Sequence, residues 1–152
     1  MKLLAATAAI LLTVPCAVAQ SMELTKADDR EGRFVSEERF TGTVFLTPVF
    51  GPNMNNIRSS EVTFLAGART AWHSHPGGQQ LVITSGTGWT QVRGGERVIM
   101  KAGDVIWCPP DVDHWHGATD KTSMTHLAIF PNAEGSGVDW KDHVSDADYL
   151  GE

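Results

Sequence analysis

The chain has 152 residues, of which 41% are hydrophobic and 20% are charged, proportions that are ordinary for one globular domain. Its formal net charge is −6, because 18 acidic residues outnumber 12 basic ones. This balance argues against nucleic acid or an anionic membrane surface as the partner, since both call for a basic patch.

The N-terminal residues differ in character from the rest of the chain. Lys2 precedes the apolar stretch Leu3–Val14, which Pro15 ends, and Ala17-Val18-Ala19 fits the small-x-small rule of signal peptidase. The apolar stretch is too short to cross a hydrocarbon core about 30 Å thick, which requires about 20 residues. We therefore predict a signal peptide at residues 1–19, a mature chain that is periplasmic or secreted, and no membrane attachment after cleavage.

Cysteine usage excludes an internal disulfide in the mature chain. Of the two cysteines, Cys16 lies in the predicted signal peptide and Cys108 remains alone. Because Cys108 ends the apolar stretch Val105–Cys108, we expect it to pack as a small hydrophobic residue and not to act as a nucleophile or ligand.

An N-terminal arm at residues 20–37 is followed by an all-β pattern at residues 38–137. Short runs rich in Val, Ile, Thr, Phe and Trp alternate with Gly, Pro and Asn, and no helical period is sustained, which is typical of an antiparallel sandwich or barrel. Gly94-Gly95 predicts a tight hairpin turn. The predicted strands are Phe40–Leu46, Ser60–Leu65, Gln80–Ser85, Gly88–Arg93, Arg97–Met100, Asp104–Cys108, Asp113–Ala118 and Met124–Phe130.

The pattern changes in a C-terminal tail at residues 138–152, where we predict a short helix. Ser145 is a suitable N-cap for that helix, and Asp146 and Asp148 would place negative charge in its first turn.

The first of two histidine clusters contains His73 and His75. Residues i and i+2 of a strand point to the same face, about 6.5–7 Å apart, so the two imidazoles can converge on one ion. The Gly77-Gly78 step lets the chain turn, so that Gln79 can return toward the same point.

The second cluster, His114-Trp115-His116, repeats this spacing. Two same-face pairs in a chain with six histidines are hard to explain as packed core residues. An imidazole-rich set without thiols suits Mn, Fe, Co, Ni, Cu or Zn and does not suit Ca. The predicted metal ligands are His73, His75, Gln79 and His114.

Both clusters resemble the two sequence motifs of the cupin superfamily. The first motif, G-x5-H-x-H-x3,4-E-x6-G, fits residues 67–86 with Gln79 in place of Glu. The second motif, G-x5-P-x-G-x2-H-x3-N, fits residues 103–118 with Asp111 for Gly and Ala118 for Asn. The resemblance implies a double-stranded β-helix, that is a jelly-roll cupin barrel, with the metal in its lumen.

Longer strings narrow the resemblance to one cupin subgroup and cover the chain from about residue 38 to residue 150. The subgroup contains the bacterial manganese-dependent cupin hydroxynitrile lyases and proteins related to carboxymuconolactone decarboxylases. Those enzymes use a His-His-Gln-His site, so the resemblance implies Mn(II) as the metal, with Fe(II), Zn(II), Ni(II) and Cu(II) as alternatives. The strings are Phe40–Val44, Ala68–His73, Gly103–Trp107, His114–Ala118, Met124–Ile129 and Val138–Trp140.

Gln79 has a physical consequence for the chemistry of the site. An amide contributes no negative charge, so three imidazoles and an amide leave a site charge of about +2, which raises Lewis acidity and resists oxidation of the metal. This favours polarising a bound oxygen over redox chemistry.

The first functional hypothesis is therefore a lyase that splits a cyanohydrin, or a similar small α-hydroxy compound, into a carbonyl compound and cyanide. His126 and His116 are the candidates for the base and for the partner of the leaving group, because a neutral imidazole can do either. Either could instead orient neighbouring groups. Val62, Thr70 and Phe130 are predicted to line the substrate pocket, and the bulk of Phe130 would narrow it.

Two other functions remain open on the sequence. One is an Fe(II) or Cu(II) dioxygenase acting on a small phenol or diketone, and the other is a cupin that binds metal or a small molecule without turnover. Cupins commonly form homo-oligomers, and we expect Trp72, Trp107 and Trp115 to pack an outer face or a subunit contact. We interpret Arg69 as an ion-pair partner in preference to a contact for an anionic substrate.

Overall fold

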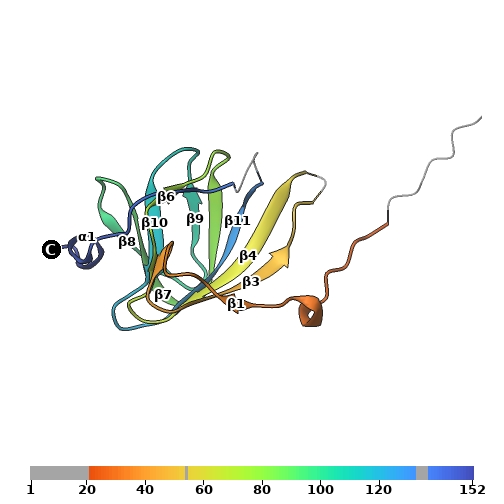
Figure 1. The fold of residues 1–152 in the computed structure, drawn as a ribbon, viewed down its shortest axis with the longest axis horizontal. Helices are drawn as coiled ribbons and strands as arrows, with labels where there is room; N and C mark the ends of the chain where they lie inside the picture. The colour runs from red at the N-terminus through yellow and green to blue at the C-terminus, as the bar shows by residue number, and fades with distance from the viewer. Residues whose placement is uncertain (1–20, 54, 133–136) are drawn as a thin grey trace, which may run out of the picture.

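The computed structural model describes residues 21–53, 55–132 and 137–152, so the predicted signal peptide lies outside the described residues. Twelve strands, one 3-10 turn and one α-helix occur in this part of the chain (Figure 1). None of its helices is both long and apolar enough to span a bilayer. The elements are η1 (Ala27–Asp29), β1 (Arg33–Phe34), β2 (Phe40–Thr41), β3 (Val44–Phe50), β4 (Ile57–Phe64), β5 (Arg69–Thr70), β6 (His73–Ser74), β7 (Gln79–Val92), β8 (Arg97–Lys101), β9 (Val105–Cys108), β10 (His114–Ala118), β11 (Met124–Pro131), β12 (Asp139–Trp140) and α1 (Asp146–Leu150).

All these strands pair antiparallel in one sheet that curls on itself. Its main path runs in the order β1-β3-β4-β11-β7-β10-β5-β2, and β6, β8, β9 and β12 pair off this path. β7 carries the curl: its first half pairs with β11 and β9, and its second half pairs with β10 and β8. We predicted two strands here, Gln80–Ser85 and Gly88–Arg93, and the structure joins them into one bent strand. The predicted all-β cupin barrel with a short C-terminal helix is confirmed.

Glycine makes the bend in β7 possible. Gly86 has φ 76°, a left-handed conformation that glycine adopts without steric cost. A Cβ on Gly88 would overlap the backbone carbonyl of Gly117 in the neighbouring β10. The small residues at this corner therefore let the two halves of β7 pair with strands on different sides of the barrel.

The apolar side chains form two clusters, one inside the barrel and one outside it. The inner cluster includes Val44, Val62, Phe64, Leu81, Ile83, Met100, Cys108 and Met124. Cys108 packs there as a small hydrophobic residue, as predicted, and burial raises the pKa of its thiol to about 12. The thiol is consequently inert near neutral pH.

The outer cluster lies between β10 and the C-terminal tail. Trp72, Trp115, Val144 and Tyr149 are buried there, with Trp89 packed against them. Trp72 and Trp115 pack on an outer face, which is one of the two expected arrangements, and the tail of the same chain covers them. Trp107, in contrast, stays 55% exposed. Figure 1 shows this segment passing β6 and ending in α1 beside β8.

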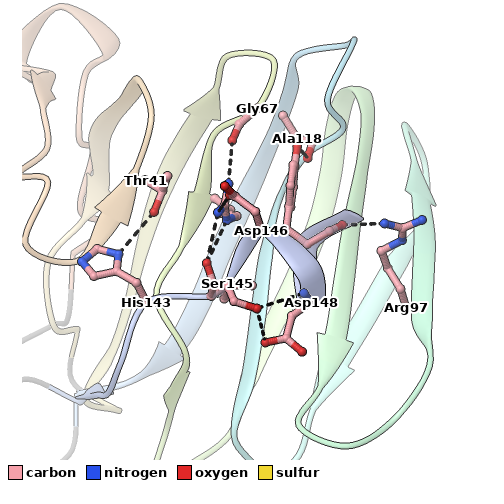
Figure 2. A network of polar contacts seen from close by, with 11 residues as sticks. Thr41, Gly67, Arg97, Ala118, His143, Ser145, Asp146 and Asp148 are labelled. Carbon is pink, nitrogen blue, oxygen red and sulfur yellow. Dashed lines mark hydrogen bonds and ion pairs between the residues drawn. The ribbon is translucent and has the colours of Figure 1, made fainter. Parts of the chain in front are cut away.

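Polar contacts tie the tail to the barrel (Figure 2). The buried Arg69 guanidinium donates to the Val144 carbonyl at 3.0 Å and to the Asp146 carboxylate at 2.6 Å, and its Cζ lies 4.3 Å from the centre of the Tyr149 ring. The Tyr149 hydroxyl donates to the Ala118 carbonyl at 3.0 Å. Arg69 is thus a structural ion-pair partner, as interpreted.

The predicted helix cap is confirmed. The Ser145 hydroxyl accepts a hydrogen bond from the backbone N–H of Asp148 at 3.0 Å, which satisfies one of the free donors of the first turn. Gly151 ends the helix in the left-handed conformation.

Candidate functional site

The structure brings together five of the six histidines, along with Gln79, inside the barrel. β6 supplies His73, β10 supplies His114 and His116, and β11 supplies His126. Each of these side chains is at most 4% exposed, which is unusual for so many titratable groups in one place. The members are His73, His75, Gln79, His114, His116 and His126.

The imidazole rings touch one another. The ring centre of His73 lies 5.2 Å from that of His75, 4.4 Å from that of His114 and 5.1 Å from that of His116. His114 and His116 have ring centres 6.0 Å apart, which agrees with a shared face of β10. The two same-face pairs therefore converge on one place.

Backbone carbonyls fix the orientation of the three histidines that we predicted as ligands. The Nδ1 atom of His73 lies 3.0 Å from the Ala71 carbonyl, that of His75 lies 2.8 Å from Gly137 O, and that of His114 lies 2.9 Å from Val112 O. A carbonyl only accepts, so each Nδ1 carries the hydrogen and each Nε2 keeps its lone pair. Metal-binding histidines are characteristically held in this tautomer.

Gln79 completes this arrangement. Its Oε1 atom lies 3.2 Å from the Nε2 atom of His114. With His114 in the tautomer above, both atoms are acceptors, and two buried acceptors facing each other repel unless a cation lies between them. The Nε2 atom of His75 is also buried, and no atom of the described residues forms a hydrogen bond with it. The donor set thus fits a divalent transition metal.

His116 competes with His75 for a place in the ligand set. One ring nitrogen from each of three residues, His73, His114 and His116, lies within 4.8 Å of the other two. His75 is not in that group. His75 still approaches His114, with ring centres 5.7 Å apart. A buried three-histidine cluster consistent with a divalent metal is therefore present, and the roles of the individual residues stay predictions.

His116 and His126 form a separate pair. The Nε2 atom of His126 lies 3.0 Å from the Nδ1 atom of His116. The other nitrogen of each ring is buried and has no hydrogen-bond partner in the part of the chain that the structure describes. Phe64 packs against both rings, with ring centres 5.8 Å and 5.5 Å away. One nitrogen of each ring is consequently left for a ligand or a proton.

Burial keeps these imidazoles neutral. It lowers the pKa of His75 and of His126 to about 4, and burial together with the neighbouring imidazoles lowers the pKa of His73 and His116 well below the ordinary value. Neutral rings are the form that binds metal and accepts protons.

A cavity of about 390 Å³ opens beside the cluster. The three predicted pocket residues, Val62, Thr70 and Phe130, all line it. Thr70 also accepts a hydrogen bond from the backbone N–H of His116 at 3.2 Å, and the Phe130 ring lies 4.7 Å from that of His75. Phe130 therefore forms part of the cavity wall beside the candidate ligands.

The sequence reasoning missed two kinds of residue in this site. Trp140 of the tail packs on His73 with ring centres 4.9 Å apart, and its strand, β12, pairs with β6. Arg33, Arg39 and Arg58 line the cavity. Trp140 belongs to a string that we had matched to the subgroup. The arginines lie in β1, in the turn before β2 and in β4, and they carry no shared sequence signal.

Comparisons with known proteins agree with this geometry. A sequence profile of the family described as Cupin_2, cupin domain, matches residues 60–130. The chain is 44% identical over 129 residues to an (R)-mandelonitrile lyase from Granulicella tundricola, which covers 84% of this chain and 98% of that protein.

Solved structures give the same picture. A cupin-like protein from Thermotoga maritima superposes with a TM-score of 0.74 at 38% identity, over 78% of this chain and 90% of that chain. The polyketide cyclase RemF from Streptomyces resistomycificus superposes with a TM-score of 0.67 at 15% identity, over 85% of this chain and 91% of that chain, and this likeness shows the fold alone.

Proposed function

The chain belongs to the cupin family, and from this premise we propose that it is a metal-dependent lyase that splits a small cyanohydrin into a carbonyl compound and cyanide. The 44% identity to an (R)-mandelonitrile lyase over nearly all of that enzyme supports this reaction. The observation that carries the proposal is the inward aim of three Nε2 atoms, each fixed by an Nδ1 bond to a backbone carbonyl.

We assign the metal to His73, His75, Gln79 and His114, and we propose Mn(II). When bound, the ion would supply Lewis acidity, which lowers the pKa of a substrate hydroxyl. Three neutral imidazoles and one neutral amide bring no negative charge to the ion, which suits this role better than redox chemistry.

The pair His116 and His126 would move the proton. We assign the tautomer in which the Nε2–H group of His126 donates to Nδ1 of His116. The Nδ1 atom of His126 then carries a lone pair and can accept a proton, and the Nε2 atom of His116 carries a hydrogen and can donate it.

In the reaction, His126 would take the proton of the cyanohydrin hydroxyl at Nδ1. The C–C bond to the nitrile breaks with its electron pair on cyanide, and the hydroxyl oxygen becomes the carbonyl oxygen. Cyanide takes the hydrogen of the Nε2–H group of His116 and departs as hydrogen cyanide, while the Nε2 hydrogen of His126 passes to Nδ1 of His116, so that both rings are neutral again. Proton exchange with water then returns each hydrogen to its starting nitrogen. The low pKa of His126 makes it a weak base, which matches a hydroxyl whose own pKa is lowered.

The pocket suits a small apolar body. Val62 and Phe130 supply apolar wall, and Thr70 lies against His116. We propose that these residues contact the substituent of the cyanohydrin carbon.

The test is cyanide release from mandelonitrile by Mn(II)-loaded protein. We expect release by the wild type, background release by His73→Ala, and wild-type release by His143→Ala, because His143 is an exposed residue of the tail outside the cavity. Background release by the wild type would contradict the lyase. Oxygen consumption with a phenol or diketone would favour the dioxygenase instead.

We also propose that the chain is exported and forms homo-oligomers. Residues 1–19 have the pattern of a signal peptide, and N-terminal sequencing of the periplasmic fraction tests that cleavage. Exposed apolar side chains on β8 and β9 suit a contact between copies, and they are Val98, Ile99, Val105 and Trp107. A monomeric mass in light scattering would contradict the oligomer.

A further inference from the structure

The cavity differs in charge from the rest of the protein. The chain carries a net charge of −6, yet the cavity lining contains Arg33, Arg39 and Arg58 and no aspartate or glutamate among the described residues. A concave site lined by one sign of charge focuses the field and concentrates the opposite charge. The lining therefore favours an anion that the surface as a whole would repel.

Two of these arginines lie over aromatic rings that in turn pack on candidate metal ligands. The guanidinium carbon of Arg39 lies 5.7 Å from the centre of the Trp140 ring, and Trp140 packs on His73 at 4.9 Å. That of Arg58 lies 5.7 Å from the Phe130 ring, and Phe130 packs on His75 at 4.7 Å. Each cation is thus one aromatic ring away from the metal ligands.

Contacts within the protein hold two of these guanidinium groups in place. Arg39 lies over Trp140, and Arg58 donates to the side-chain oxygen of Asn132 at 2.9 Å, which fixes its direction. Within residues 21–53, 55–132 and 137–152, no carboxylate lies within 4.0 Å of the side-chain nitrogens of Arg33 or Arg39. A guanidinium stacked on a ring still presents its N–H groups at the edge, where they can bind a carboxylate.

We propose that this pocket selects substrates that carry a carboxylate at the end remote from the reacting carbon, bound by Arg39 with added attraction from Arg33. The substrate would be an aromatic or similarly sized cyanohydrin with a carboxylate about one ring away from its hydroxyl. The choice of a cyanohydrin rests on the proposed lyase function, whereas the anion site rests on the cavity lining alone.

Binding of non-reacting probes to the metal-loaded protein tests the anion site without turnover. The probes are 4-(hydroxymethyl)benzoate and its neutral amide, 4-(hydroxymethyl)benzamide, measured by titration calorimetry. We expect the carboxylate to bind about tenfold more tightly than the amide, as one or two charge-assisted hydrogen bonds would give. In the double variant Arg33→Gln/Arg39→Gln the ratio should approach one.

Lys121→Gln is the matched control, because that lysine is exposed and lies outside the cavity lining. It should keep the tenfold ratio. Equal affinity of the two probes for the wild type would overturn the proposal. So would a ratio that persists in the double arginine variant and disappears in His73→Ala, since the carboxylate would then be binding the metal.

Turnover gives the second readout. The ratio of kcat/KM for 4-carboxymandelonitrile to that for mandelonitrile should exceed one by about tenfold in the wild type and fall in each single arginine variant. Cleavage of both nitriles at equal kcat/KM would overturn the anion site and leave the lyase standing. Arginine-dependent probe binding without cleavage of either nitrile would overturn the lyase and support the anion site.

Discussion

The two faces of β10 are both buried, and they are buried in different ways. On the inner face, His114 and His116 point to the lumen, and three of the four buried side-chain polar atoms without a partner, counted over the described residues, belong to histidines of this cluster. On the outer face, Trp115 is fully buried, and its indole N–H donates to the Gln91 side chain at 2.9 Å.

The outer face is therefore built for stability. The partners of Arg69 and Tyr149 are present within the protein, so burial there leaves little for a ligand to satisfy. The inner face contains buried polar atoms that lack hydrogen-bond partners, which lowers the stability of the fold. Such atoms are expected only where a ligand supplies the missing partner. The difference separates a functional cluster from a structural one within a single strand.

The largest effect should come from the inner face. His126→Gln should lower kcat for mandelonitrile by about 10²–10⁴-fold, because it removes the proposed base. Metal content should stay at the wild-type level in elemental analysis, since His126 is not an assigned ligand. Wild-type kcat in this variant would move the role of base to His116.

Truncation on the outer face should act on stability instead. Trp115→Ala should lower the free energy of unfolding by about 3–5 kcal/mol, because it leaves a cavity between β10 and the tail. Urea unfolding measures the change. The folded fraction should still bind one metal ion, and loss of the metal without loss of stability would break the distinction between the faces.

Low pH should lower the stability of the protein, because the inner face buries neutral histidines. Burial lowers the pKa of His126 to about 4 in the folded protein, against about 6.5 when unfolded, so the unfolded state binds more protons. Stability should therefore fall as the pH drops below about 6.5 and level off below about 4. From pH 7.5 to 5.5, His126 alone should contribute about 1 kcal/mol.

Urea midpoints in the presence of EDTA measure this slope without a contribution from metal release. His126→Leu should flatten it. An equal slope in wild type and His126→Leu would show that this histidine is not the source.

The smallest effect should come from a single hydrogen bond of the tail. Tyr149→Phe removes the donor to the Ala118 carbonyl and should cost about 1 kcal/mol in urea unfolding. Its cyanide release should match the wild type. A large loss of activity would indicate that the tail affects the inner site more strongly than packing of the outer face suggests.

Local patterns made much of this structure predictable. The alternation and turn residues gave the strands, the His-x-His spacing located both clusters, and Ser145 marked the helix start. Each of these features depends on neighbours in sequence, where the geometry of strands and caps is nearly fixed.

What could not be predicted depends on contacts between distant segments. The tail covers Trp72 and Trp115, the three arginines meet at the cavity, and His116 lies as close to His73 as His75 does, within 0.1 Å between ring centres. Strand periodicity tells which face a side chain takes, but it does not tell which segment will lie opposite. The ranking of His75 and His116 as ligands is a tertiary question for the same reason.

The central claim is that the inner face holds a divalent metal through His73, His75, Gln79 and His114. Calorimetric titration with Mn(II) tests it most directly on three proteins: wild type, His75→Ala and Tyr149→Phe. We predict one ion per chain for wild type and Tyr149→Phe, and an affinity at least about tenfold weaker for His75→Ala. Equal affinity in all three proteins would contradict the claim.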